Sequence, residues 1–293
     1  MSVVDPKTGR WNIFFNRKRT FRSYLDLVKW YLKRQVVSVP YRLTARFRKL
    51  PDFLIIGVAK GGTSSLFSYL EQHPDMQLSR EQEIHFFASF YERGINYYRS
   101  FFPFKNSEKL TGESSPYYFL HPQVPARVKK DLPHAKIILL LRDPVKRAYS
   151  NYNMVKGVDW VDSFEEAVQI EKDRITPHHE KMKVDPSYKN QHHQTFSYVT
   201  RGFYYSQLQN WLEHYDLSEM LILKSEDMFE NPKSTLAKVY HFLGVEEVFP
   251  EDLRPRNNRV YNGLSNEDYD KYKQLYTEDA NKLSALLGDQ FKW

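Results

Sequence analysis

Residues 52–65 have the sequence Asp52-Phe-Leu-Ile-Ile-Gly57-Val-Ala-Lys60-Gly-Gly-Thr63-Ser64-Ser65. The aliphatic run before Gly57 predicts a short buried β-strand. The glycines that follow predict a tight turn, and residues 65–71 have helical spacing that ends near His73-Pro74. A turn that leads into a helix can present backbone N–H groups to an anion. The alternative is an ordinary strand–turn–helix in which the glycines serve only the turn geometry.

Strands and helices alternate through the rest of the chain. Further buried strands are expected at 136–141 and 221–224, and a strand end at 110–116. Helices are expected at 125–130, at 144–154, from the capping box at 163–166 towards 174, at 205–215 and at 234–243. Residues 175–196, which are polar with prolines and two His pairs, predict a long loop. The pattern predicts an α/β fold, a P-loop-like parallel sheet flanked by helices on both faces.

Composition narrows the class of protein. The 293 residues include no cysteine, which excludes disulfide scaffolds, thiolate zinc sites and cysteine nucleophiles. No apolar run approaches the ~20 residues that span a bilayer, and the first residues lack the apolar core of a secretory signal. We therefore expect a soluble, cytoplasmic protein, with peripheral membrane contact left open.

The positive charge is concentrated at the N-terminus. The net charge is +7, yet residues 1–50 hold 13 Lys or Arg and two acidic residues, so the remainder is net negative. We expect residues 1–50 to be a basic, partly helical arm and residues 51–293 a single domain. The arm either contacts an anionic surface or packs on its own domain with its cations in water. The negative remainder opposes a nucleic-acid partner.

The first loop differs from the nucleoside-triphosphate P-loop at one decisive position. Thr63 stands where G-x-x-x-x-G-K-[ST] has its lysine, and Lys60 lies three residues earlier. In the triphosphate loop that lysine reaches the β- and γ-phosphates and the next hydroxyl holds Mg²⁺. The loop therefore predicts anion binding without the metal-holding pattern of a kinase.

A second candidate site follows the strand at 136–141. Arg142 lies at the strand end and Ser150 lies in the helix that follows, so the two can form a phosphate clamp. Two anion sites at the carboxyl ends of strands of one sheet strengthen each other, because ligands bind at that edge. The alternative is that Arg142 pairs with Asp143 or caps a neighbouring helix.

The segments GVAKGGTSSL and LLLRDPVKRAYSNY resemble the 5′- and 3′-phosphate-binding elements of the PAPS-dependent sulfotransferases, in their carbohydrate-type (heparan sulfate) and bacterial branch. The likeness continues through EQEIHFFASF, TGESSPYYF, TRGFYYSQLQNWL and LKSEDMFENPKSTLAKVYHFLGV, over about residues 51–250. It implies a sulfotransferase fold, PAPS (3′-phosphoadenylyl sulfate) as donor, 3′,5′-adenosine bisphosphate (PAP) as product, and no metal.

The resemblance also implies roles for individual residues. The 5′-phosphosulfate is expected at Lys60, Gly61, Gly62, Thr63, Ser64 and Ser65. Lys60 would stabilise the leaving oxygen. The 3′-phosphate is expected at Arg142 and Ser150. Arg201 matches a segment near the cofactor and acceptor, and Arg256, in Arg256-Asn-Asn-Arg259, stands where relatives close a basic loop over the 3′-phosphate.

The acceptor hydroxyl needs a base. Glu83 matches the base of the carbohydrate-type enzymes, and His85 is a second candidate because its ordinary pKa suits base work. If 83–87 is extended, both side chains point to one face, and burial against Phe86 and Phe87 is expected to raise the pKa of Glu83.

Acceptor contacts are expected from Glu113, Tyr117 and Tyr118. Glu113 is either a second acid or the partner of a basic residue in the cleft. Position 114 is serine where some relatives have lysine, so a lysine contact is not carried over.

The prediction is in-line transfer of a sulfuryl group from PAPS to a hydroxyl of a carbohydrate or glycolipid. Alternatives are a polyketide, lipid or other small-molecule acceptor, a P-loop kinase, and a basic nucleotide- or membrane-binding protein without catalysis. The pairs His178-His179 and His192-His193 lack strong ligand spacing, so a solvated loop is favoured over a metal site.

Overall fold

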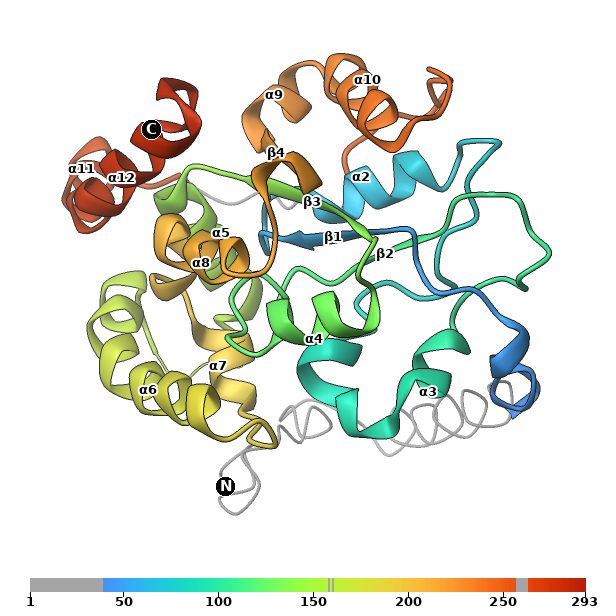
Figure 1. Cartoon of the computed structure of the whole chain (residues 1–293). Helices are drawn as coiled ribbons and strands as arrows, with labels where there is room; N and C mark the ends of the chain where they lie inside the picture. The colour runs from blue at the N-terminus through green and yellow to red at the C-terminus, as the bar shows by residue number, and fades with distance from the viewer. Residues whose placement is uncertain (1–38, 158, 160, 257–262) are drawn as a thin grey trace, which may run out of the picture.

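The computed structural model describes residues 39–157, 159, 161–256 and 263–293 (Figure 1). Most of the predicted arm, residues 1–38, and Arg259 lie outside this range. Within it the sheet has four parallel strands in the order β2-β1-β3-β4. They are β1 (Phe53–Gly57), β2 (Gly112–Ser114), β3 (Lys136–Leu141) and β4 (Met220–Lys224). The predicted fold class is confirmed.

Both faces of the sheet are covered because its strands are apolar on both sides. In β1, Leu54 and Ile56 face one hydrophobic cluster, while Phe53 and Ile55 face the other. In Figure 1, α2 (Thr63–Leu70), α9 (Ser225–Glu230) and α10 (Pro232–Leu243) lie above the sheet, and α3 (Ile95–Arg99) and α4 (Val124–Asp131) lie below it. This is the burial pattern of a parallel α/β sheet.

Six further helices complete the described part of the fold. They are α5 (Pro144–Val155), α6 (Phe164–Val184), α7 (Gln191–Phe196), α8 (Tyr204–Leu212), α11 (Asn266–Lys273) and α12 (Thr277–Leu287). Short 3₁₀ turns are η1 (Ala45–Phe47), η3 (Tyr91–Arg93), η4 (Thr200–Gly202), η5 (Leu217–Glu219), η6 (Gln274–Tyr276) and η7 (Asp289–Phe291); η2 (Phe86–Phe90) is a π-helical turn. Residues 39–43 are also helical.

Local signals explain where several helices begin and end. The Asp143 carboxylate caps α5 by accepting from the N–H groups of Val145 and Lys146. Ser163 caps α6, and Gly244 ends α10 in a left-handed conformation. These caps satisfy N–H and C=O groups that helix ends leave without intrahelical partners.

The expected loop at 175–196 is wrong. Helix α6 continues to Val184, and α7 follows after a short connection. Ala167, Ile175 and Met182 form a buried stripe on α6, and the buried Glu171 carboxylate accepts from the N–H groups of Val199 and Thr200. Pro177 lies inside the helix, where proline is unfavourable, and the tertiary packing of this stripe outweighs that cost.

The strand order indicates where a ligand-binding crevice is expected. The chain leaves β1 for β2 on one side and returns to β3 on the other, so the order reverses between β1 and β3. Ligands of open α/β sheets bind at such a switch point, outside the carboxyl ends of the strands. The loop after Gly57 and the Arg142 segment meet there.

Candidate active site

Three contacts from neighbouring segments hold the loop after β1. The Val58 N–H donates to the Leu140 carbonyl at 2.8 Å. Arg142 Nη1 donates to the Lys60 carbonyl at 2.8 Å, and Ser225 Oγ donates to the Gly61 carbonyl at 2.7 Å. The loop thus donates to β3 through Val58 and accepts from Arg142 and Ser225 at two carbonyls, so it is anchored to the ends of β3 and β4.

Two glycines give this loop its shape. Gly62 has φ +87°, and a Cβ there would lie 2.4 Å from Met228 Cε and 2.8 Å from the Phe229 ring. A Cβ on Gly61 would lie 2.9 Å from the Val58 carbonyl oxygen. Within the described part of the chain, no backbone carbonyl accepts from the N–H groups of Gly62, Thr63 and Ser64. These amides at the start of α2 form the predicted anion cradle.

Arg142 has a different partner from either alternative that its sequence position suggested. Its side chain donates to the Lys60 carbonyl and so links the two predicted anion sites. Asp143 instead caps α5 and accepts from the Tyr269 hydroxyl at 2.7 Å.

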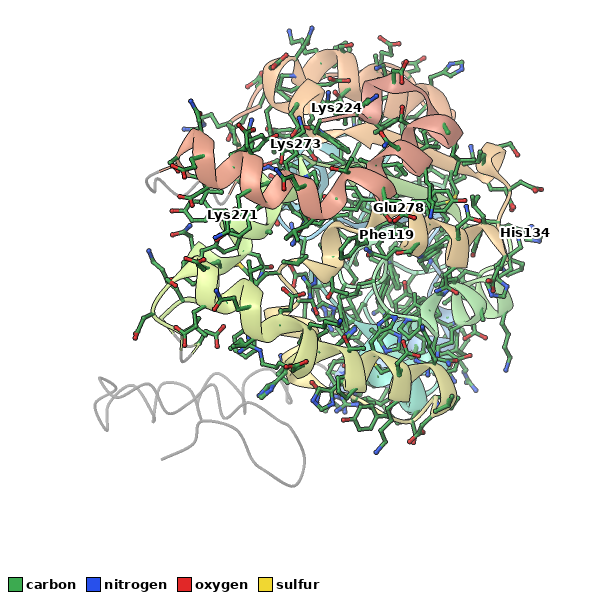
Figure 2. All side chains as sticks on the ribbon, turned by 90° about the vertical axis from the view of Figure 1, so that its left-hand side faces the viewer. Phe119, His134, Lys224, Lys271, Lys273 and Glu278 are labelled. Atoms are coloured by element: carbon green, nitrogen blue, oxygen red, sulfur yellow. The ribbon has the colours of Figure 1, made fainter. Side chains whose placement is uncertain are left out.

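A cavity of about 500 Å³ lies beside Arg142. Its lining comprises Arg142, Lys146, Tyr149, Gly263, Leu264, Asn266 and Tyr269. Helix α11 packs against α5, and Figure 2 looks onto α11 and α12, with Lys271, Lys273 and Glu278 labelled along them. Ser150 is buried on α5, one residue beyond Tyr149, and does not line the cavity. Contact of Ser150 with a 3′-phosphate stays a prediction.

Arg256 approaches the first loop through its backbone. Its N–H donates to Ser65 Oγ at 2.9 Å, while its side chain binds Ser68 Oγ and the Asp252 carboxylate at 3.0 Å each. The segment therefore lies against α2, and its guanidinium is directed to that helix. Phosphate contact by Arg256 stays a prediction.

Glu83 and His85 lie in a turn, so the condition of an extended 83–87 segment is not met. Both have φ +54°, and η2 begins directly after them. The Glu83 N–H donates to the Ser114 carbonyl at 2.8 Å, and the His85 N–H donates to Ser115 Oγ at 3.2 Å. The two side chains nevertheless meet, because His85 Nε2 lies 3.3 Å from Glu83 Oε2.

The electrostatics of Glu83 also differ from the expectation. Its side chain is 55% exposed. The hydrogen bond from His85 holds the pKa of Glu83 below its ordinary value, and the charges of His85, Arg201 and Lys60 lower it further. Glu83 is therefore ionised at neutral pH and surrounded by cationic groups, so the expected raised pKa is wrong.

Arg201 is the buried cation of this group. Its guanidinium lies 5.5 Å from the centre of the Tyr117 ring and donates to the Gln194 carbonyl. Burial, together with the nearby charge of Arg147, lowers the pKa of Arg201 to about 10. Glu83 thus has His85 in direct contact and the charges of Arg201 and Lys60 close enough to lower its pKa, and the predicted roles of these four residues stay predictions.

The three predicted acceptor contacts are buried. Glu113 and Tyr118 have no exposed surface, and Tyr117 is 4% exposed. The Tyr98 hydroxyl donates to Glu113 Oε1 at 2.9 Å, and the Tyr117 hydroxyl bonds to His193 Nδ1 at 2.7 Å. These positions favour a supporting role beneath the cleft, and acceptor contact by them stays a prediction.

The residues present fit a nucleotide that carries phosphate groups at both ends. Arg201 Nε and His85 Nδ1 are buried and have no hydrogen-bond partner within the described residues. An anionic group can satisfy the Arg201 Nε donor, which would otherwise be costly to leave unpaired. The cavity beside Arg142 has the volume of an ordinary small-molecule site.

Several residues that shape this edge were not predicted from the sequence. Ser225 anchors the Gly61 carbonyl, and Met228 and Phe229 fill the space next to Gly62. Glu226 Oε1 accepts from the Asp143 N–H at 2.9 Å. All of them follow β4 directly, so their place at the carboxyl end of a predicted strand was the available signal.

The pair His178-His179 lies in α6, and the pair His192-His193 lies in α7. His179 Nδ1 bonds to His193 Nε2 at 3.0 Å, and His178 Nδ1 bonds to the Tyr188 hydroxyl at 2.7 Å. The predicted solvated loop is thus replaced by a packed helix pair. No group of three or more His, Asp or Glu side chains is placed to hold a metal ion in the described ranges.

Residues 50–287 match the sulfotransferase domain family, so the chain belongs to that family. It is 29% identical over 316 residues to the membrane-associated sulfotransferase kil1 of Dictyostelium discoideum, covering 83% of this chain and 66% of the relative. It is 30% identical over 272 residues to heparan sulfate glucosamine 3-O-sulfotransferase 3B1 of Homo sapiens, covering 84% and 65%. The chain spans just under two thirds of the length of these relatives.

Solved structures show the same fold. A sulfotransferase from Alicyclobacillus acidocaldarius superposes with a TM-score of 0.68 at 27% identity, covering 82% of this chain and 96% of that one. A mouse sulfotransferase complexed with PAP has a TM-score of 0.51 at 16% identity, covering 87% and 93%, which is a likeness of fold alone.

Proposed function

We propose that this chain is a PAPS-dependent sulfotransferase that transfers a sulfuryl group to a hydroxyl of a carbohydrate or glycolipid. The observation that carries the proposal is the contact of His85 Nε2 with the Glu83 carboxylate at 3.3 Å, where the charges of Arg201 and Lys60 also lower the pKa of Glu83. The loop that holds Lys60 leads into the open amides at the start of α2. Family membership and the heparan sulfate relatives support the choice of donor and acceptor class.

Each residue of this group then has a defined task. The amides of Gly62, Thr63 and Ser64 bind the 5′-phosphate end of the donor, which supplies the sulfuryl group. Lys60 stabilises negative charge that develops on the leaving oxygen. Glu83 is ionised and accepts the proton of the acceptor hydroxyl, while His85 orients the carboxylate through its Nε2. Arg201 holds anionic oxygens at the inner wall of the cleft.

The donor is tested by calorimetry with PAP, with ATP and Mg²⁺, and with an oligonucleotide. Micromolar binding of PAP without a Mg²⁺ requirement is expected. Preference for ATP and Mg²⁺ would support a P-loop kinase, and binding of the oligonucleotide alone would support a basic binding protein without catalysis.

The acceptor is tested by transfer of label from ³⁵S-PAPS. Heparan sulfate is the first acceptor to test, because of the relative at 30% identity. Desulfated heparan sulfate serves as a second acceptor, and a lipid extract and a polyketide set as the others. Label in the lipid or polyketide arm alone would move the acceptor class away from carbohydrate.

A basic, apolar surface near the N-terminus supports peripheral contact with an anionic surface. Val39, Leu43 and Phe47 are exposed at spacings of four residues, and Arg42 and Arg46 accompany them. Such a stripe can rest on anionic lipid. No helix among the described residues is long and apolar enough to cross a membrane.

Sedimentation with phosphatidylcholine vesicles, with and without phosphatidylserine, tests the contact, and equal binding to both contradicts it. A cytoplasmic location stays a prediction.

A further inference from the structure

A fully buried carboxylate lies directly beneath the Glu83–Phe87 turn. Glu113, in β2, accepts from the Tyr98 hydroxyl at 2.9 Å and from Ser115 Oγ at 3.3 Å. The Tyr118 hydroxyl also faces this carboxylate, and its interaction lowers the pKa of Glu113. Three hydroxyl groups from two segments of the chain therefore converge on one side chain.

Two of these hydroxyls also hold the backbone of the turn. Ser115 Oγ accepts from the His85 N–H at 3.2 Å, and the Tyr118 hydroxyl accepts from the Phe87 N–H at 3.3 Å. A hydroxyl has one proton to donate. Since the Glu113 carboxylate attracts that proton in both cases, the lone pairs of Ser115 and Tyr118 are turned towards the amides.

The turn needs such support because its backbone is strained. Glu83 and His85 both have φ +54°, in the left-handed region that costs energy for residues with a side chain. Residues in this region persist where surrounding contacts fix them. The His85 and Phe87 amides, together with the bond from the Glu83 N–H to the Ser114 carbonyl, are the contacts that tie the turn to β2 and the segment after it.

We propose that Glu113 is a positioning residue that holds Glu83 and His85 in place by orienting the Ser115 and Tyr118 hydroxyls. This inference rests on the proposed function, because it assigns Glu113 to the support of the proposed base. Neither role considered from the sequence, a second acid or the partner of a basic residue, matches the contacts that Glu113 makes.

The chemistry of the network requires an acceptor at both oxygens. An ionised carboxylate is acceptor-only, whereas an amide has an NH₂ group on one side. Gln at position 113 would therefore turn a donor towards Tyr98 or towards Ser115, and one hydroxyl would have to rotate. The titratable groups that face Glu113 are Tyr98 from α3, Tyr118 from the segment after β2, and His85 from the turn. Burial raises the pKa of Glu113 to about 7, so its ionised form dominates above that pH.

Two buried tyrosines provide a matched pair of variants. Tyr98→Phe and Tyr118→Phe each remove one hydroxyl that faces Glu113, from rings that are both without exposed surface. Only the Tyr118 hydroxyl accepts an N–H of the turn. A merely structural role for the cluster predicts equal effects from the two variants, whereas positioning of the turn predicts unequal ones.

The first measurement is hydrogen exchange of the backbone amides of residues 83–89 in the PAP-bound protein. We expect exchange at Phe87 to rise in Tyr118→Phe by about threefold or more, and at His85 and Phe87 in Glu113→Gln, because these amides lose oriented acceptors. Tyr98→Phe should stay near the wild type at both amides. This readout needs no acceptor.

The second measurement is transfer of ³⁵S label to heparan sulfate at pH 8, with PAP affinity measured alongside. Glu113→Gln and Tyr118→Phe should lower kcat roughly tenfold or more, as small misplacements of reacting groups do. PAP affinity should stay within about twofold, since the cradle on α2 does not touch this network. Equal effects of the two tyrosine variants, or wild-type exchange and turnover in Glu113→Gln, overturn the proposal.

A different set of results would show that the proposed function is wrong. If the wild type neither binds PAP nor transfers label, the assignment of the enzyme fails, and the exchange pattern of the three variants still decides whether Glu113 holds the turn. If Glu113→Gln does not fold, the comparison of Tyr98→Phe with Tyr118→Phe carries the test.

Discussion

The loop at residues 58–65 and the turn at residues 83–87 lie on the same edge of the sheet but are held in different ways. The loop is stabilised by side chains that follow β3 and β4, and each donates to a loop carbonyl. The turn is held through its N–H groups by the Ser114 carbonyl and by hydroxyls that a buried carboxylate orients. The loop presents open amides, and the turn presents a carboxylate.

This difference separates the two halves of the proposed reaction. Amides at a helix start attract an anion without titrating, so the donor side works over a wide pH range. The turn depends on two acids whose pKa values move in opposite directions. Hydrogen bonding from His85 lowers the pKa of Glu83, and burial raises the pKa of Glu113. The pH dependence of the enzyme should therefore arise on the side of the turn.

Glu83→Gln should have the largest effect, because it removes the proton acceptor and keeps the side chain's shape. General base catalysis contributes roughly 10²- to 10⁴-fold, so kcat should fall by that range while PAP affinity changes little. Label transfer from ³⁵S-PAPS and calorimetry with PAP measure the two quantities. A variant with a tenth of the wild-type rate would show that another group, His85 first among them, takes the proton.

Lys60→Ala tests the loop side of the comparison. Its help is greatest in the transition state, so we expect kcat to fall roughly 10²- to 10³-fold, with a modest loss of PAP affinity. Lys60→Arg is the matched control, because it keeps the charge at nearly the same place. Near wild-type turnover in the alanine variant would remove Lys60 from the mechanism.

Gly62→Ala should distort the loop and leave the turn intact. The added Cβ would meet Met228 Cε at 2.4 Å, and φ +87° disfavours any side chain. Overpacking of this kind costs about 1–3 kcal/mol of stability, and PAP affinity should fall with it. Urea unfolding and PAP calorimetry measure both. The double variant Gly62→Ala, Met228→Ala should recover part of the loss, and the absence of any recovery contradicts the packing explanation.

How much the sequence could predict also differs between the two regions. The loop lies within a dozen consecutive residues, so local spacing and glycines identified its strand, its turn and its amides. The turn is fixed by residues 30 positions away, such as Ser115 on His85, and no local pattern reports such a contact. For the same reason the left-handed conformation of Glu83 and the lowered pKa of its carboxylate were missed.

Helices α6 and α7 are a second case in which contacts between distant residues decided the structure. Composition favoured a loop over residues 175–196, because the segment is polar and proline is disfavoured in helix interiors. The stripe of Ala167, Ile175 and Met182 packs into the core regardless, and His179 and His193 join the two helices by a hydrogen bond. Local propensity was outweighed by contacts that only the folded chain contains.

The smallest expected effect is a pH-dependent difference in stability that isolates Glu113. Burial raises its pKa from 4.5 to about 7 in the folded protein, so between these values the folded state binds more protons than the unfolded state. The contribution of this group to the free energy of unfolding is therefore fully present at low pH and decreases as the pH rises towards 7, by about 1 kcal/mol between pH 6 and pH 8. Glu83, whose pKa is lowered, titrates below this window. Urea unfolding at pH 6, 7 and 8 should show this decline in the wild type relative to Glu113→Gln, which has no ionisable group at position 113. Parallel stability profiles for the two proteins would mean that the carboxylate is already ionised at pH 6, and the turn would then have no titrating support in the neutral range.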